Sequence, residues 1–134
     1  GIDLTKTTAE LSGEWINKQL ERYETHGLGH LAVIEKASGA FIGMGGILIR
    51  EIDKEIAFEI AYSLKPKFWR KGFGTEIAKK MKCFGTENGI ANQFISIIQK
   101  NNLESINVAK KNQMNILSET DYLGMKVFIY GTEI

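Results

Sequence analysis

The sequence has one cysteine and one proline in 134 residues, and it has no long run of hydrophobic residues. One cysteine excludes an internal disulfide and favours a reducing compartment. No segment is apolar over the length that a bilayer requires, and the first residues lack the basic, then apolar, then small pattern of a signal peptide. These absences lead us to expect a cytoplasmic protein whose one cysteine, Cys83, is a small buried side chain within a helix.

The sequence also lacks an excess of positive or negative charge. It has 17 lysines and arginines and 16 aspartates and glutamates, which give a formal net charge of +1. This balance gives no electrostatic case for binding nucleic acid or a membrane surface. His26 and His30 have no cysteine or acidic partner at metal-ligand spacing, so we predict no metal. The length and the hydrophobic fraction of 43% fit one globular domain over residues 1–134, as a monomer or a homodimer.

Hydrophobic periodicity predicts a helix, a three-strand antiparallel meander, a helix, a strand, another helix and one or two final strands. Thr7 and Glu10 form a capping box at the first helix. The stripe of that helix that we expect to be buried comprises Leu11, Trp15, Ile16 and Leu20. Strands are expected at 30–35, 40–49, 56–64, 94–98 and 125–130, with helices from 74 to about 88 and from 103 to about 112. The pattern indicates an α/β (α+β) fold in which a crossover helix joins two parallel strands of a mixed sheet with helices on both faces.

Residues 59–76 form a strand that leads through a loop into a helix, with Gly72 and Gly74 at the junction. Glycines let the backbone approach a bulky group, and the first amides of a helix have no partner inside it. The helix dipole favours an anion at this end. Positive charge and a hydroxyl are added by Arg70, Lys71 and Thr75. The predicted ligand is a phosphate or a pyrophosphate.

Two common phosphate loops do not fit this stretch. A dinucleotide-binding fingerprint requires a third glycine where the chain has Ile77, and no Gly-Lys-Ser or Gly-Lys-Thr closes a P-loop. The strand order differs as well, because both of those folds begin with parallel strand–helix units. Taken alone, Gly-x-Gly before a helix is also compatible with a tight helix entry that binds no ligand.

Residues 69–76, Trp-Arg-Lys-Gly-Phe-Gly-Thr-Glu, resemble the acetyl-CoA pyrophosphate loop of the GCN5-related N-acetyltransferase (GNAT) family. The similarity is greatest to the branch of the ribosomal-protein N-terminal acetyltransferases RimJ and RimL, which typically has Trp-Gly-Lys-Gly-Tyr-Ala-Thr-Glu here. Three further segments resemble that branch, and they come in the family's order. They are the hairpin 38–43, the strand 59–66 and the Asn-x-x-Ser helix start at 102–105, so the resemblance covers roughly residues 30–130.

The chain departs from the family pattern at four places. Trp69 stands where the broad family has glutamine or arginine, and Arg70 replaces the usual glycine of the branch. Residues 111–114 read Lys-Asn-Gln-Met where the branch has Lys-Leu-Gly-Phe. The family's first strand is missing ahead of the opening helix, so we expect a single N-acetyltransferase domain that is N-terminally incomplete.

The resemblance implies a GNAT-like fold, which is a mixed, mostly antiparallel twisted sheet flanked by helices. It implies acetyl-CoA as co-substrate, no metal, and as acceptor a primary amine of a protein N-terminus, a peptide or a small molecule. The pantetheine arm is expected along the end of the third strand and the phosphates at the loop. The residues implied to bind the cofactor are Tyr62, Ser63, Leu64, Trp69, Arg70, Lys71, Gly72, Phe73, Gly74, Thr75 and Asn102.

The resemblance also implies that Glu59 is the general base and that Ser105 is the acid that protonates the leaving thiolate. In the alternative interpretation, Glu59 faces solvent or forms a salt bridge, Asn102 only caps a helix, and Ser105 has no special role. Tyr122 and Tyr130 are alternative acids. Two functions follow: an active N-acetyltransferase, or a catalytically silent coenzyme-A-binding module that senses or interacts.

Overall fold

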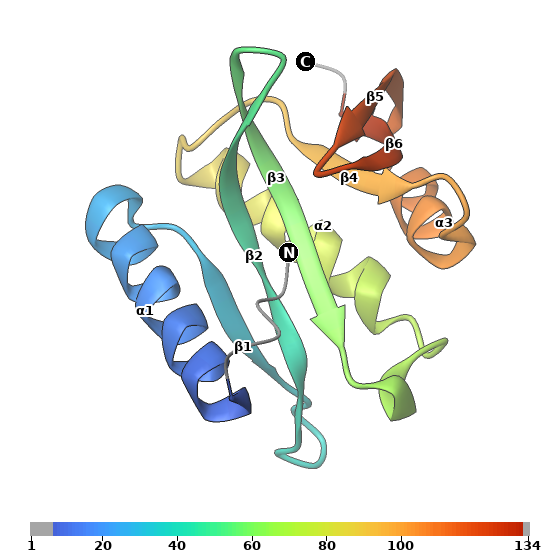
Figure 1. Cartoon of the computed structure of the whole chain (residues 1–134). Helices are drawn as coiled ribbons and strands as arrows, with labels where there is room; N and C mark the ends of the chain where they lie inside the picture. The colour runs from blue at the N-terminus through green and yellow to red at the C-terminus, as the bar shows by residue number, and fades with distance from the viewer. Residues whose placement is uncertain (1–6, 133–134) are drawn as a thin grey trace.

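The computed structural model describes residues 7–132, and the predicted element order is confirmed with both final strands present (Figure 1). The helices are α1 (Thr8–His26), α2 (Phe73–Glu87) and α3 (Leu103–Lys111), and a 3₁₀ turn, η1, covers Pro66–Phe68. The strands are β1 (His30–Ile34), β2 (Phe41–Ile52), β3 (Glu55–Leu64), β4 (Ile95–Gln99), β5 (Asn115–Tyr122) and β6 (Met125–Gly131).

The strands form one sheet in the order β1-β2-β3-β4-β6-β5. Neighbouring strands are antiparallel except β3 and β4, which pair in parallel through Glu59 and Ile95. The helix α2 makes the crossover that a parallel pair requires. The predicted mixed, mostly antiparallel sheet flanked by helices is therefore confirmed.

The parallel pair opens soon after it forms. β3 pairs with β2 along its whole length, whereas its pairing with β4 is confined to Glu59 and Ile95. The Ser96 hydroxyl donates to the Ile60 carbonyl at 3.3 Å, and no later ladder pair joins β3 to β4 in the described residues. The last residues of β3 therefore have one backbone edge without a strand partner. An extended ligand can bind such an edge as an added strand would.

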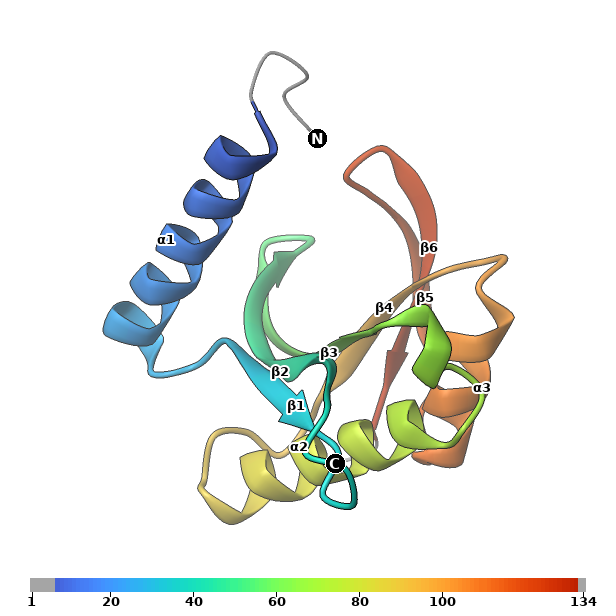
Figure 2. The ribbon, with the colours of Figure 1, turned by 90° about the horizontal axis from the view of Figure 1, so that it is seen from below.

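The main core lies between one face of the sheet and the helices α2 and α3, which Figure 2 shows on the same side. Phe94 is fully buried in this core, and burial of a side chain of this size stabilises the fold by roughly 1.5–3 kcal/mol. Gly85 of α2 lies so close to Phe94 and Ile47 that a Cβ would clash with both side chains. The missing side chain thus lets α2 approach the sheet.

The helix α1 lies on the other side of the sheet and leans away from it (Figure 2). Its predicted capping box is confirmed, because the Thr7 side chain accepts from the Glu10 amide and the Glu10 carboxylate accepts from the Thr7 amide. Gly27 ends the helix in the left-handed conformation, with a φ of +68°. Both ends of α1 are therefore set by local sequence.

The prediction that the apolar stripe of α1 is buried is wrong. The exposed fractions of Trp15, Ile16 and Leu20 are 41%, 52% and 56%. Two hydrogen bonds fix α1 to His30 at the start of β1: Gln19 Oε1 accepts from its amide at 3.5 Å, and the Tyr23 hydroxyl donates to its carbonyl. Because these bonds hold the helix at one residue of an edge strand, the stripe stays largely in solvent.

The structure also bears on Cys83, on residues 111–114 and on the chain ahead of α1. The prediction that Cys83 is buried is wrong, because its side chain is exposed on α2. The altered segment 111–114 does not prevent the last strands, and Met114 is buried in the main core just before β5. The expected absence of the family's first strand concerns the chain ahead of α1, where residues 1–6 lie outside the described residues.

Candidate functional site

A cavity of about 630 Å³ lies where the end of β3, the loop before α2 and the first turns of α2 and α3 meet. Its lining residues are Tyr62, Ser63, Leu64, Trp69, Arg70, Gly72, Gly74, Thr75, Asn102, Glu104, Ser105, Asn107, Val108 and Lys111. The set contains Ser105 and every residue predicted to bind the cofactor except Lys71 and Phe73. Segments far apart in the chain therefore meet at one cavity.

The start of α2 offers free backbone donors. Its N-cap, Gly72, is in the left-handed conformation with a φ of +85° and makes no side-chain hydrogen bond to the helix. The first bond of the helix runs from the Glu76 amide to the Gly72 carbonyl at 3.1 Å. The amides of residues 73–75 thus have no partner within the helix. These donors, at the positive end of the helix dipole, suit a phosphate or a pyrophosphate.

Gly74 stands where α2 approaches both β3 and α3. A Cβ at this position would lie 3.2 Å from the Tyr62 ring and 3.5 Å from a methyl group of Val108. Tyr62 and Val108 both line the cavity, so a side chain at position 74 would displace them. The glycine therefore leaves room for the lining side chains beside the free amides.

Two side chains tie the loop to its neighbours. The Trp69 Nε1 donates to the Leu64 carbonyl at 2.8 Å, which fixes the loop to the end of β3. The Arg70 Nε donates to Glu104 Oε1 at 2.8 Å, and this ion pair joins the loop to α3. The side chains of Arg70 and Glu104 are 84% and 53% exposed, so their pairing contributes little to stability. It does bring a carboxylate to the cavity.

The side chains of Lys71 and Phe73 do not belong to the cavity lining. The Lys71 Nζ lies 5.7 Å from the centroid of the Phe68 ring, and the Phe73 ring meets the same ring edge-on at 6.1 Å. Phe68 is buried at the end of η1. Both side chains therefore pack around the base of the loop, while the Phe73 amide is one of the free donors.

The start of α3 contributes an amide and a hydroxyl. Asn102 is the N-cap of α3, and its Oδ1 accepts from the Ser105 amide at 3.2 Å. The helix-cap interpretation thus holds for the Asn102 oxygen, and the Nδ2 group is left as a donor. Ser105 interacts through its side chain with the Tyr62 hydroxyl. Burial raises the pKa of Tyr62, the Ser105 contact lowers it and the Glu104 charge raises it, and the net increase keeps the phenol protonated at neutral pH.

Glu59 lies on the face of the sheet opposite α2 and α3, because its neighbour Ile60 points into the main core. It is not among the residues that line the cavity. Its Oε1 accepts from the Arg50 Nε at 2.8 Å, and the two side chains are only 11% and 28% exposed. The salt-bridge interpretation therefore describes Glu59 in this structure. A role as base requires that the pair opens or that Arg50 takes another partner.

The two alternative acids lie away from the cavity. Tyr130 is buried in the main core, and its ring meets Phe128 edge-on. Tyr122 packs against a second apolar cluster on the opposite face of the sheet, formed by Ile95, Val127 and Ile129. Neither tyrosine lines the cavity.

Sequence reasoning missed several residues of the site. Four of them lie on α3 and line the cavity: Glu104, Asn107, Val108 and Lys111. Helical spacing would have found Val108, which follows Ser105 by three positions, and Lys111 three positions later. Arg50 was missed because its partner Glu59 lies on the next strand, and only the strand register brings them together.

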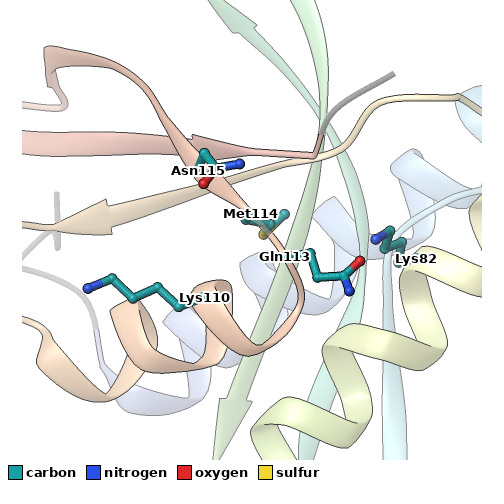
Figure 3. Close-up of a pocket in the computed structure, with 5 residues that line it drawn as sticks. All are labelled: Lys82, Lys110, Gln113, Met114 and Asn115. Atoms are coloured by element: carbon teal, nitrogen blue, oxygen red, sulfur yellow. The ribbon is translucent and has the colours of Figure 1, made fainter.

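A second cavity, of about 640 Å³, lies between α2 and the junction of α3 with β5 (Figure 3). Its lining residues are Lys82, Lys110, Gln113, Met114 and Asn115. The Lys82 Nζ donates to the Asn112 carbonyl at 3.4 Å, and Figure 3 shows the Lys110 side chain extending away from Lys82. No predicted site residue belongs to this cavity, so the predicted chemistry does not lie there.

Metal centres and membrane-spanning helices are two further features that would bear on function. Within residues 7–132, no group of three His, Cys, Asp or Glu side chains lies close enough together to hold a metal ion. In the same part of the chain, no helix has the length and apolar character needed to cross a membrane.

Comparisons with known proteins agree with this geometry. The sequence model of the acetyltransferase (GNAT) domain matches residues 4–115. The chain is also 26% identical over 98 residues to the uncharacterized protein YkkB of Bacillus subtilis (strain 168). That match covers 73% of this chain and 57% of YkkB, so the chain spans little more than half the length of this curated relative.

Solved structures share the fold. A Bordetella pertussis protein assigned to the GNAT family of acetyltransferases superposes with a TM-score of 0.83 and 13% identity, covering 99% of this chain and 82% of that one. RimL, a ribosomal L7/L12 alpha-N-protein acetyltransferase in complex with coenzyme A, gives a TM-score of 0.79 and 18% identity, covering 96% and 74%. At these identities the likeness shows the fold, whereas the domain match extends over most of the sequence. This chain therefore belongs to the acetyltransferase (GNAT) domain family, a family of acyltransferases.

Proposed function

We propose that this domain is an N-acetyltransferase that moves the acetyl group of acetyl-CoA to a primary amine by direct attack in a ternary complex. The observation that carries the proposal is one cavity that joins the free amides of α2, the open edge of β3 and the polar start of α3. These three parts suit a pyrophosphate, an extended pantetheine arm and its amide groups. The proposed acceptor is a protein N-terminus, a peptide or a small amine, and the first of these is the kind that RimL, which shares the fold, is named for. We propose that the protein works in the cytoplasm as a monomer or a homodimer.

Each part of the cofactor has proposed partners in this chain. The amides of residues 73–75 bind the phosphates, and Arg70 and Lys71 supply positive charge beside them. The backbone of residues 62–64 binds the pantetheine arm, and one of its amides donates to the thioester oxygen as negative charge develops there. Asn102 donates from its Nδ2 to the same arm. When bound, acetyl-CoA supplies the thioester carbon that the amine attacks.

The chain must also move protons. An alkyl amine is mostly protonated at neutral pH, and it must lose one proton before it can attack. We assign that proton to Glu59 once its pairing with Arg50 is relieved. The nitrogen then forms a bond to the carbonyl carbon while the carbon–sulfur bond breaks. The Ser105 hydroxyl, which interacts with that of Tyr62, delivers one proton to the sulfur. The nitrogen sheds its second proton, which restores the proton that these hydroxyl groups gave up. The products are an amide and a free thiol.

A catalytically silent coenzyme-A-binding module is the second candidate function. The observation in its favour is the ion pair between Arg50 and Glu59, which occupies the proposed base and leaves it outside the cavity lining. The cavity would bind the cofactor in the same way under both functions. The two are therefore separated by turnover and not by binding.

The test is a thiol-release assay with acetyl-CoA and a panel of primary amines. For Glu59→Gln we expect kcat to fall by roughly 10²-fold or more, with acetyl-CoA affinity retained, because the variant keeps the shape and loses the base. Ser105→Ala is expected to lower kcat as well. Glu55→Gln, an exposed position on the same face of β3, is the matched control and should keep kcat.

Turnover of any amine would support the active N-acetyltransferase. Tight acetyl-CoA binding without turnover of any amine would support the silent module. An equal kcat for wild type and Glu59→Gln would remove Glu59 from the mechanism. No binding of acetyl-CoA at all would contradict both candidates.

A further inference from the structure

The face of the sheet opposite α2 and α3 carries charged side chains that the proposed proton transfer uses only in part. His30 of β1 pairs with Gly46 of β2. Arg50 lies four positions further along β2 and therefore on the same face. Glu59 of β3 lies on this face as well, because it pairs with Leu48, which is midway between Gly46 and Arg50 on β2. Figure 1 looks onto this face, with α2 behind the strands.

A second arginine reaches this face from α1. Gln19 Oε1 accepts from the Arg22 Nη1 at 3.3 Å and from the His30 amide at 3.5 Å, so it holds Arg22 beside the start of β1. Burial and the Arg50 charge lower the pKa of Arg22, while the Glu59 charge raises it, so these groups act on one another electrostatically. We call Arg22, His30, Arg50 and Glu59 the acceptor-face cluster.

The acceptor-face cluster has more positive than negative charge. Glu59 neutralises Arg50 across 2.8 Å, whereas Arg22 takes part in no ion pair within the described residues. Burial and the charges of Arg22 and Arg50 lower the pKa of His30, so the imidazole is neutral at pH 7. Two guanidinium groups thus face one carboxylate. An anion bound between the arginines would neutralise the remaining charge.

Two buried polar atoms, one within the cluster and one beside it, also lack partners. Gln19 is only 7% exposed, yet its Nε2 has no hydrogen-bond partner among the described residues, and the same is true of the His30 Nδ1. A buried donor without an acceptor is unfavourable, and native structures rarely leave one unpaired. A ligand that accepts hydrogen bonds at this place accounts for the unpaired Gln19 amide, and a negative charge on it accounts for Arg22, which has a hydrogen bond to Gln19 but no ion pair in the described residues.

We propose that the acceptor is a primary amine that also carries a carboxylate, which binds Arg22 and Arg50 while the ammonium group faces Glu59. This inference rests on the proposed acetyl transfer. A guanidinium group donates two parallel hydrogen bonds to a carboxylate, so the incoming carboxylate is a suitable new partner for Arg50. The exchange releases Glu59 to accept the amine proton. An amine without a carboxylate would instead meet an excess of positive charge, which repels its ammonium form.

Two kinds of acceptor share this chemistry. A free amino acid carries its α-carboxylate beside the amine, and a peptide that begins with aspartate carries a side-chain carboxylate at a similar distance. Each acceptor is paired with an uncharged twin that lacks this carboxylate. For the amino acid the twin is its amide. For the peptide, made with an amidated C-terminus, the twin begins with asparagine in place of aspartate. Steady-state kinetics on both pairs separates the two sources.

The experiment compares kcat/KM within each pair for the wild-type protein, Arg22→Gln, Arg22→Lys and Lys18→Gln. In at least one pair we expect wild type to prefer the carboxylate member by roughly tenfold or more, as for one charge-assisted contact. Arg22→Gln should remove most of this preference by raising KM for the carboxylate member of the pair. Arg22→Lys should keep part of it. Lys18→Gln removes one exposed positive charge of α1 and should keep all of it.

Every outcome decides the inference. Turnover without a preference for the carboxylate member in either pair overturns it, and so does a preference that survives in Arg22→Gln with native circular dichroism. Thiol release from no amine despite acetyl-CoA binding overturns the proposed acetyl transfer itself, and this inference with it. A preference confined to the peptide pair identifies a protein or peptide N-terminus, and one confined to the amino acid pair identifies a small molecule.

Discussion

At the scale of single residues, two hydroxyl groups lie together at the place where we propose that the leaving sulfur takes up a proton. Ser105 is oriented by the Asn102 cap, and its side chain contacts the hydroxyl of Tyr62, which reaches the same place from β3. Because burial raises the pKa of Tyr62, this phenol keeps its proton throughout the neutral range. Either group can therefore replace the other in part. For this reason we expect Ser105→Ala to lower kcat less than Glu59→Gln does.

A carboxylate at the proposed phosphate site makes a second residue testable. Glu104 lines the cavity and pairs with Arg70, so it both repels phosphates and competes for one of their proposed partners. We expect Glu104→Gln to lower the Kd for acetyl-CoA about two- to fivefold at low salt, as measured by titration calorimetry. The gain should shrink at about 0.5 M salt, because exposed charges are screened there. Glu87→Gln, the same change at the far end of α2, should leave the Kd unchanged, and a weaker Glu104→Gln complex would contradict this arrangement of charges.

At the scale of elements, the loop and the start of α2 depend on two glycines for different reasons. A side chain at Gly72 meets open space but must adopt a φ of +85°, so we expect Gly72→Ala to lower the free energy of unfolding by about 1–2 kcal/mol. At Gly74 the backbone is unstrained, but a methyl group contacts Tyr62 and Val108. We therefore expect Gly74→Ala to change stability little and to raise the Kd for acetyl-CoA roughly tenfold.

Urea unfolding and calorimetry of the two glycine variants check this division. Gly74→Ala also gains helix propensity, which offsets part of the cost of the contact. If Gly72→Ala were as stable as wild type, or if Gly74→Ala bound acetyl-CoA as tightly as wild type, the corresponding role would be wrong. The pair is its own control, because each variant adds one methyl group within the same turn.

The elements also show which features the sequence can predict. The capping box of α1, the glycine at its end and the glycine-containing junction before α2 are local patterns, and the structure contains each of them as expected. The burial of an apolar stripe is not local, because it requires another element to cover the stripe. On α1 the stripe meets little more than the His30 ring of β1, whose centroid lies 5.7 Å from that of Trp15, and Trp15, Ile16 and Leu20 remain exposed. Periodicity therefore predicted the helix correctly and its environment incorrectly.

At the scale of the whole molecule, the sheet separates the cavity proposed to bind acetyl-CoA from the charged cluster proposed to bind the acceptor. The cavity with the free amides lies on the side of α2 and α3, whereas the acceptor-face cluster lies on the other side, next to the point where β3 and β4 part. Motifs predicted most of the cavity residues, because an anion site at a helix start is made by neighbours in sequence. They did not predict the surroundings of Glu59, since its partner Arg50 comes from another strand and Arg22, whose charge acts on it without an ion pair, comes from a helix.

Binding of acetyl-CoA should therefore stabilise segments that are distant in sequence but not the whole chain equally. At a concentration of 100 times the Kd, a ligand specific for the folded state adds about 2.7 kcal/mol to the free energy of unfolding, which for a domain of this size raises Tm by roughly 10 °C. In hydrogen exchange we expect protection of residues 61–64, 69–75 and 102–108 together, because these segments surround one cavity. Exchange of α1 should not change, since it lies on the far side of the sheet. Adenosine diphosphate, which has the phosphates but no pantetheine arm, should protect 69–75 alone and raise Tm less, and equal effects of the two ligands would show that the open edge of β3 does not bind the arm.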